Sequence, residues 1–499
     1  MKRHLTAVER FRVIGKFIKE GSKHAAYALV FGKYLKRQSG ARLQSQKELG
    51  QSLNAKNTGL LIDGAEGRIS ERESCQNICV IARVGAGKTS RYIIPNVLDK
   101  ATRKCSIVVN DPKGEVFAET SGYMQSKGFK VIAINPEDLQ NSASFNPLLE
   151  AKTDIEIEQV AEILIKAGSG SSAKDQFWDN GAIRLISVLL KLLQRAGQQD
   201  PAHYTLGNLY HLLQNFGSDG TPLDEFVIHW AYDPTNPNDN TLWEEWKGAT
   251  TGNSNAVQSF ALTALTALKA FTNRNLVALT ATSSVNLEDI RREKTVIYFI
   301  TPPHLTEYYG FWTSVFFRSV FNASMRRMPD RRTLPLYVLY DEFGHSTIPS
   351  FVSVANTIRG YKVSLSIVLQ SLSQLSARYG PDYARSIQGG FMAYLAYAGS
   401  DQDTARFFEA IAGKVVDVRR DKIEDVTQQR QEYNLLNADE VRRIGDTQAI
   451  LVSANRHPAL LETTPYFVHR RYSKIPRRYG PARITGAVQP GQVKRIALS

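Results

Sequence analysis

Cysteine is scarce in this sequence: the 499 residues include only three, Cys75, Cys79 and Cys105. Cys75 and Cys79 form one pair without a second pair of Cys or His at ligand spacing, which excludes the usual structural zinc site. Cys79 lies inside an apolar run, so we expect it to pack in the core. Cysteine used this sparingly is typical of a reducing cytoplasm.

Long apolar runs are also absent. No stretch approaches the roughly 18 consecutive apolar residues of a membrane-spanning helix, and the best run covers only Ala25–Phe31. No small-residue cleavage site follows that run, so a secretory signal peptide is not expected. Residues 8–18 instead predict a basic amphipathic helix. Such a helix lies on a membrane surface or docks on its own domain or a partner, and both alternatives stay open.

Acidic residues are few at the two ends of the chain. The net charge is +14, and residues 1–50 hold 12 Lys/Arg against 3 Asp/Glu. After Glu462 there are 8 Lys/Arg and no acid, so the ends are basic arms on a nearly neutral body. Basic arms suit phosphate backbones or anionic membranes; the alternative is that they are solvated tails.

Short apolar runs alternate with helical patterns in two parts of the chain, which indicates strands buried on both faces of a mostly parallel sheet and an α/β fold. Between residues 150 and 285 helical spacing dominates, so we expect an inserted helical domain, with a loop over 232–241. After residue 474 no periodicity remains, and we expect a flexible tail. The predicted strands are ICVIA (78–82), SIVVN (106–110), KVIAI (130–134), TVIYFI (295–300), PLYVLY (335–340), SLSIVL (364–369) and FMAYLAY (391–397).

The strongest motif is a phosphate-binding loop between the first strand and a helix. Its glycines let backbone amides converge on phosphate oxygens at a helix N-terminus. Lys88 is expected to neutralise the β- and γ-phosphates of ATP, and the Thr89 hydroxyl to bind Mg²⁺. The alternative is a glycine-rich turn that binds nothing, which leaves the position of Lys88 unexplained. The expected nucleotide-binding residues are Arg83, Val84, Gly85, Ala86, Gly87, Lys88, Thr89 and Ser90.

Three further features fit this loop. Asp341 and Glu342 end an apolar strand, where Asp341 would hold Mg²⁺ and Glu342 would polarise the attacking water. Gln370 ends another strand and would contact the γ-phosphate or the water, unless it is a plain surface residue. Arg359 could act as an arginine finger on a neighbouring subunit, or merely favour a helix end. The adjacent acids and the missing Asn-Lys-x-Asp signature favour ATP over a GTP switch.

These motifs resemble a known family, the type IV secretion system coupling proteins, which are conjugative-transfer ATPases related to FtsK-like DNA translocases. The resemblance covers most of residues 76–465, and an alanine at position 82 is common in that family. The landmarks occur in the family's order. They are ARVGAGKTSRYIIPNVL (82–98), VVNDPKGEVFAETSGY (108–123), SFNPL (144–148), QFWDNGAIRLI (176–186), YDEFGHSTIPSF (340–351), VLQSLSQLSARYG (368–380), SDQDTARFFEAIAGK (400–414) and LNADEVRRIGDTQAILV (436–452).

The resemblance implies a RecA-like P-loop NTPase domain with an inserted all-α domain. It also implies a homo-hexamer on DNA, with a monomer in isolation as the alternative, and it strengthens the roles of Gln370 and Arg359. It does not assign roles to Asp111, Lys113 and Glu115. We place the boundaries as follows: a basic N-terminal segment over 1–65, the RecA-like domain over 66–150 and 286–465, the all-α domain over 151–285 and a basic tail over 466–499.

The expected function is an ATP-hydrolysing coupling protein that recruits relaxase-bound DNA and pumps it, without sequence specificity, to a type IV secretion channel. The alternative is a recruitment adaptor for relaxase or effector proteins, ordered by ATP but without DNA pumping. A chromosome-partitioning or packaging motor is disfavoured by the helical insert and by the FNPL and FWDN landmarks. Many family members begin with membrane-spanning helices. Here we expect a cytoplasmic protein at the inner membrane, recruited by a partner or by its N-terminal basic helix.

Overall fold

The computed structural model describes residues 39–169, 176–216, 221–235, 240–251, 253–419, 429–453, 455–484, 488 and 493–498. The amphipathic helix expected over 8–18 and the apolar run at 25–31 lie outside these residues. None of the helices within the described residues combines the length and apolar character needed to cross a bilayer.

The body is built on a nine-stranded sheet with the order β12-β11-β8-β2-β7-β6-β3-β5-β4. All neighbouring strands from β8 to β4 are parallel, whereas β11 runs antiparallel to both β8 and β12. The strands are β2 (Ile78–Ile81), β3 (Ser106–Asn110), β4 (Lys130–Ile134), β5 (Thr295–Phe299), β6 (Leu336–Tyr340), β7 (Val363–Leu369), β8 (Ala393–Tyr397), β11 (Gln448–Ser453) and β12 (Ala459–Glu462).

Helices cover both faces of this sheet, as the alternation of side chains in β2 shows. Ile78 and Val80 belong to an apolar cluster with α5 (Ile94–Lys100) and α6 (Glu115–Ser126). Cys79 and Ile81 belong to a second cluster that includes α14 (Thr306–Met325) and α15 (Phe351–Thr357). Since every second residue of a strand points to the same face, β2 is buried from both sides, which explains its uninterrupted apolar run.

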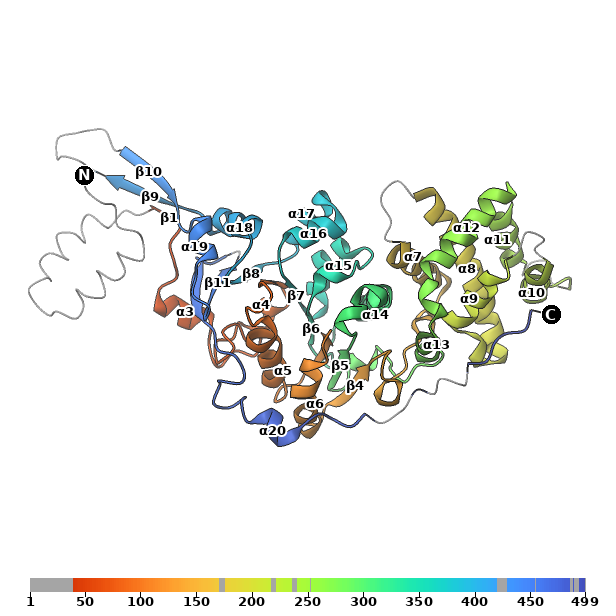
Figure 1. Ribbon diagram of the computed structural model, residues 1–499, viewed down its shortest axis with the longest axis horizontal. Helices are drawn as coiled ribbons and strands as arrows, with labels where there is room; N and C mark the ends of the chain where they lie inside the picture. Colours follow the sequence, from red (N-terminus) through yellow and green to blue (C-terminus); the bar gives the residue numbers. More distant parts are fainter. Residues whose placement is uncertain are drawn as a thin grey trace, which may run out of the picture.

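Between β4 and β5 the described chain forms helices and no strand (Figure 1). The 24-residue α8 lies at the centre of this part, in contact with α7 and α12. Every residue of α8 from Leu185 to Leu193 is buried, so this stretch is covered on all sides, as in a helix that other helices surround. The helices are α7 (Asp154–Ser169), α8 (Gln176–Gln199), α9 (Leu206–Gln214), α10 (Thr221–Ala231), α11 (Thr241–Thr250), α12 (Ser254–Ala267) and α13 (Arg274–Leu279).

A second, three-stranded antiparallel sheet extends from the body at the upper left of Figure 1. Its strands are β1 (Ser39–Gly40), β9 (Lys414–Arg419) and β10 (Gln429–Asn434). The shorter helices are α3 (Gln46–Ser52), α4 (Glu71–Ser74), α16 (Ser373–Tyr379), α17 (Pro381–Gly389), α18 (Gln402–Ala412), α19 (Ala438–Arg442) and α20 (Ile475–Tyr479).

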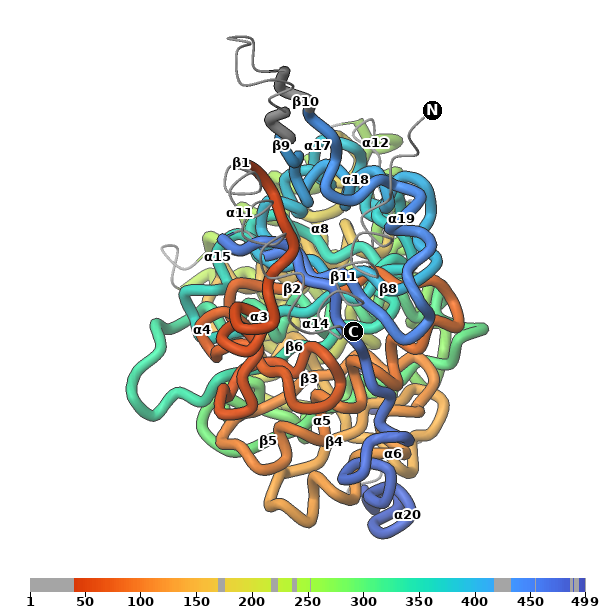
Figure 2. The backbone as a smooth tube through the Cα atoms, turned by 90° about the vertical axis from the view of Figure 1, so that its left-hand side faces the viewer, coloured from red at the N-terminus to blue at the C-terminus, as the bar shows by residue number. Residues whose placement is uncertain are grey.

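We expected a flexible tail after residue 474, and this expectation was wrong for the described part of that segment. The helix α20 packs beside α6 (Figure 2), and the amide of Ala482 donates to Oγ of Ser121. Further on, the amide of Ile496 donates to Oδ1 of Asn208, and the Ile496 side chain is buried. The described residues of this segment therefore contact both the α/β body and the helical part. The apolar residues after residue 474 are few and show no periodicity, so the sequence pattern did not predict that this segment packs against the rest of the chain.

Candidate active site

The loop from Ala82 to Lys88 joins the end of β2 to a helix that begins with a π-helical turn, Thr89–Ile93, and continues as α5. Gly85 and Gly87 have φ angles of +83° and +80°. This left-handed conformation is open to glycine and costly for other residues, so both glycines are required by the loop's shape. The loop thus ends at a helix N-terminus, where backbone amides and the helix dipole favour an anion.

Lys88 reaches from this loop to the end of β6. Its Nζ lies 2.5 Å from Oε1 of Glu342, and both side chains are largely buried. Glu342 itself has a φ of 53°, an uncommon backbone conformation for a non-glycine residue. The strained turn directs the carboxylate toward the loop, and an ion pair between two such distant residues fixes the relative position of β2 and β6 at this edge.

Thr89 and Asp341 form a second contact between the same two elements. The Thr89 hydroxyl donates to Oδ2 of Asp341 at 3.0 Å, and Nδ2 of Asn110 donates to the Asp341 backbone oxygen at 2.6 Å. Asp341 is 5% exposed. Burial raises the pKa of Asp341 to about 6, against the opposing influence of Lys88. A carboxylate at this depth is costly unless it is balanced by a cation or by hydrogen-bond donors.

Glu342 collects further donors on its other oxygen. Nε2 of Gln370 donates to Oε2 of Glu342 at 2.9 Å, and Nε2 of His345 lies 3.5 Å from the same atom. Burial acts to raise the pKa of Glu342, but the bonds from His345 and Lys88 outweigh it and lower the pKa to about 2. The carboxylate is therefore ionised and oriented by three neighbours.

The structure thus brings together Lys88, Thr89, Asp341, Glu342 and Gln370. Parallel strands whose carboxyl ends share an edge explain this, since Ile81 is the register partner of Leu369. The roles of these residues in binding and hydrolysis stay predictions.

Four other expected nucleotide-binding residues lie around the same loop. Arg83 and Val84 are exposed at its tip, and Ala86 donates to the backbone oxygen of Arg83. Ser90 lies in the first helical turn, where its hydroxyl donates to the Gly87 oxygen.

Arg359 is not part of this cluster. It lies in a short 3₁₀ helix, Ile358–Tyr361, before β7, and it is exposed. Because β7 has seven residues, Arg359 and Gln370 are separated by a strand of roughly 23 Å, on opposite edges of the sheet. Arg359 therefore cannot serve the loop of its own chain.

The Asp111 side chain, whose role the sequence left open, caps a helix. Oδ2 of Asp111 accepts the backbone amide of Phe117 in α6 at 2.8 Å. Burial raises the pKa of Asp111 to about 6, although this bond acts in the other direction. Lys113 and Gly114 line a pocket of about 330 Å³ beside the ends of β3, β4 and β5.

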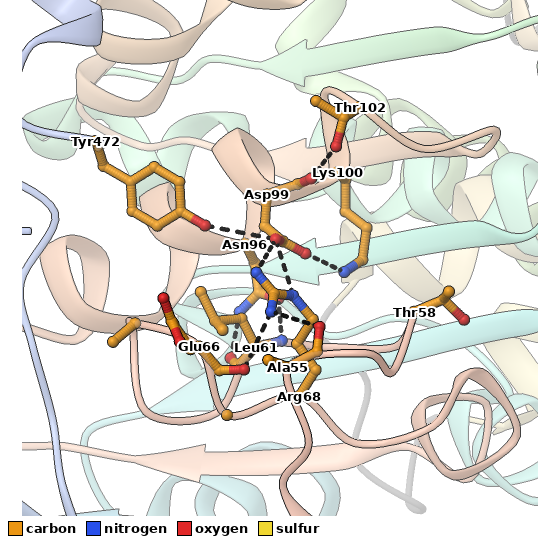
Figure 3. Close-up of polar contacts among 12 residues, drawn as sticks. Ala55, Thr58, Leu61, Glu66, Arg68, Asn96, Asp99, Lys100, Thr102 and Tyr472 are labelled. Atoms are coloured by element: carbon orange, nitrogen blue, oxygen red, sulfur yellow. Dashed lines mark hydrogen bonds and ion pairs between the residues drawn. The ribbon is translucent and has the colours of Figure 1, made fainter. Parts of the chain in front are cut away.

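A buried polar network holds α5 in place (Figure 3). Nη2 of Arg68 lies 2.6 Å from Oδ1 of Asp99, whose other oxygen accepts from Nζ of Lys100 at 2.9 Å. The Tyr472 hydroxyl also donates to Oδ1 of Asp99 at 3.4 Å. This network therefore joins three parts of the chain: the segment before β2, the helix α5 and the C-terminal segment.

The sequence assigned no role at this site to Asn110, to His345 or to the residues after β12. Asn110 directly precedes Asp111, and His345 follows Glu342 by three residues inside a quoted landmark, so position next to a motif was the available signal. The residues after β12 stood out only for their basic composition, since only the folded sheet brings them to this edge.

Known proteins resemble this chain in sequence and in fold. The family model described as type IV secretory system conjugative DNA transfer matches residues 35–485. VirD4 of Rhizobium rhizogenes is 24% identical over 421 residues, which cover 79% of this chain and 59% of VirD4. The chain therefore spans less than two thirds of the length of this relative.

Among solved structures, the bacterial conjugative coupling protein TrwBΔN70, in a trigonal form with sulphate, superposes with a TM-score of 0.71 at 16% identity. The match covers 90% of this chain and 97% of that one. The coupling protein TrwB in complex with ADP and Mg²⁺ gives a TM-score of 0.65 at 16% identity, over 88% and 97% of the two chains. These likenesses confirm the expected fold class, a RecA-like P-loop domain with an all-α domain. By the family match over most of its length, the chain belongs to the type IV secretory system proteins of conjugative DNA transfer.

Proposed function

We propose that this chain hydrolyses ATP and uses the energy to move DNA, delivered by a relaxase, into a type IV secretion channel. The observation that carries the proposal is the meeting of Lys88 and Thr89, where the loop passes into the helix, with the two acids that follow β6. Lys88 contacts Glu342 at 2.5 Å, and Thr89 contacts Asp341 at 3.0 Å. A cationic loop at a helix N-terminus facing paired carboxylates is the arrangement that phosphoryl transfer to water requires.

The residues present fit a magnesium–ATP complex. The Thr89 hydroxyl and the Asp341 carboxylate are hard oxygen ligands lying together, as Mg²⁺ prefers. Gly85 and Gly87 leave the backbone open to close approach by phosphate. TrwB, with the same fold, binds ADP and Mg²⁺. When bound, Mg²⁺ supplies charge neutralisation on the β- and γ-phosphates.

The ion pair between Lys88 and Glu342 suggests how binding prepares hydrolysis. When Lys88 turns toward a phosphate, its contact with Glu342 weakens. The Glu342 carboxylate is then free to accept a proton from the attacking water, while Gln370 and His345 keep it oriented. Binding and activation of the general base are thereby coupled through one side chain.

Arg359 supports assembly into a ring, and we propose a homo-hexamer on DNA. Since Arg359 lies on the edge of the sheet opposite its own loop, it can complete only the site of a neighbouring subunit. The basic arms provide non-specific, salt-sensitive contact with DNA, and the N-terminal arm or a partner places the protein at the inner membrane.

The test is the ATPase rate as a function of protein concentration, with and without single-stranded DNA. A DNA pump with shared sites shows a cooperative rise with concentration and stimulation by DNA. An ATP-ordered recruitment adaptor shows hydrolysis or binding that is indifferent to DNA, and that result would reject the pumping proposal.

A further inference from the structure

A short segment after β12 lies beside the phosphate-binding loop, although it is far away in sequence. The strand β12 is antiparallel to β11, which is antiparallel to β8, so β12 ends at the same edge as β8 and its parallel neighbour β2. The segment Thr463–Phe467 therefore emerges at the edge where the P-loop lies. Ligands of open α/β sheets bind outside this edge.

Two direct contacts fix the segment to the first turn after the loop. The backbone amide of Tyr466 donates to the Ser90 oxygen at 2.9 Å. Nη1 of Arg91 donates to the backbone oxygen and to Oγ1 of Thr463, at 2.9 and 3.0 Å. Ser90 and Arg91 directly follow Thr89 in the sequence, so the segment contacts the residues next to the expected Mg²⁺ ligand.

The two aromatic side chains of this segment differ in exposure. Tyr466 is partly buried and packs against the apolar cluster that contains α5 and α6. Phe467 is 59% exposed, and its ring meets that of Tyr466 edge to face at 5.6 Å, with an interplanar angle of 80°. The Phe467 side chain is therefore exposed to solvent, whereas the neighbouring Tyr466 is held by its packing and by its backbone hydrogen bond to Ser90.

The direction of the bound nucleotide follows from the position of the acids. Glu342 and Gln370 come just after β6 and β7, which lie on one side of β2, so the γ-phosphate must face that side. The opposite end of the nucleotide then extends to the other side of β2, toward β8, β11 and β12. The segment Thr463–Phe467 begins on that other side, where Oγ1 of Thr463 donates to the backbone oxygen of Thr447, just before β11, at 2.7 Å. From there it runs past Ser90 toward α6, whose Glu119 contacts the Tyr466 hydroxyl.

We propose that Phe467 stacks on the base of the nucleotide whose phosphates occupy the loop, with Tyr466 as the positioning residue that holds it beside Ser90. This inference rests on the proposed function and names the base subsite of the same site. Because every nucleobase presents a flat π-face to an aromatic ring, a stacking contact of this kind discriminates little between ATP and GTP.

The experiment measures equilibrium binding of two probes, magnesium ATP and magnesium tripolyphosphate, to the full chain and to Phe467→Ala. Tripolyphosphate carries the phosphates without the base. Loss of stacking weakens ATP binding about tenfold or more in Phe467→Ala and leaves tripolyphosphate binding unchanged. Phe467→Trp, which preserves a ring, retains the ATP affinity.

The matched control is Tyr383→Ala, since Tyr383 is 64% exposed and lies in α17, which packs on α15 and α16. Tyr383→Ala leaves both affinities unchanged. ATP binding that is indifferent to Phe467→Ala overturns the base subsite alone, as does an equal loss for both probes. A wild-type chain that binds neither probe overturns the proposed nucleotide site, and this inference with it.

Discussion

Nζ of Lys88 lies 2.5 Å from Oε1 of Glu342, although 254 positions separate the two residues in the chain. The contact joins the two parts of the predicted site, which are the loop after β2 and the acidic turn after β6. Both side chains are largely buried, at 10% and 17% exposure, so neither charge is balanced by water alone. A change at either residue therefore removes the nearest opposite charge from its partner.

Lys88→Ala is expected to lower the ATPase rate about 100-fold or more, because the β- and γ-phosphates lose their counter-charge. Nucleotide affinity falls with it, since the same charge acts in the ground state. The measurement is steady-state hydrolysis together with equilibrium ATP binding. Lys104→Ala, at an exposed lysine after α5, is the control and keeps both values. Wild-type turnover in Lys88→Ala would refute the assignment of the site.

Arg359→Ala is expected to abolish cooperative turnover while ATP binding stays unchanged, since the guanidinium acts only across a subunit interface. Mixing Arg359→Ala with Lys88→Ala restores activity, because an intact loop in one subunit then faces an intact Arg359 in the next. Arg331→Ala, an exposed arginine before β6, is the control and needs no such rescue. Two inactive variants that stay inactive when mixed would argue against the finger.

Asp99→Ala is expected to lower the free energy of unfolding by about 3–5 kcal/mol, because Arg68 and Lys100 would remain buried with their shared partner removed. Urea unfolding followed by circular dichroism measures this change. Arg292→Ala breaks an exposed pair with Asp330 and serves as the comparison, with little effect. Equal effects of the two variants would show that the buried network does not hold α5.

Ile496→Asp is expected to lower the free energy of unfolding by about 2 kcal/mol, the worth of one buried aliphatic side chain. The loss is local: amide hydrogen exchange accelerates in α9, where Asn208 exchanges hydrogen bonds with Lys494 and Ile496. Lys494→Ala removes only an exposed ion pair with Asp200 and changes little. Unchanged exchange in α9 after Ile496→Asp would mean that the C-terminal segment does not brace the helical part.

Much of the sheet could be predicted because its central strands are buried on both faces and read as unbroken apolar runs. The expected strand over 106–110 matches β3, and that over 364–369 differs from β7 by one residue. The strand β12 alternates buried and exposed residues over only four positions, too short a pattern to recognise. The order of the strands was also beyond the sequence, since pairing depends on contacts between distant segments.

The site also has parts that could be predicted from the sequence and parts that only the folded chain shows. Lys88, Thr89, Asp341 and Glu342 could be identified because phosphate and magnesium chemistry demands those residue types at strand ends. Asp111 stood out in the sequence for its place in a landmark, yet its carboxylate caps α6. The sequence did not point to the residues after β12, because only the antiparallel return through β11 and β12 brings Tyr466 to Ser90.

The account depends most directly on Glu342 acting as the general base, and Glu342→Gln tests it. The variant keeps the side chain's size, can still accept a hydrogen bond from Lys88, and removes the negative charge. We expect Glu342→Gln to bind ATP with near wild-type affinity and to show no hydrolysis in a single-turnover assay, with or without single-stranded DNA. Hydrolysis by Glu342→Gln at the wild-type rate would contradict the account.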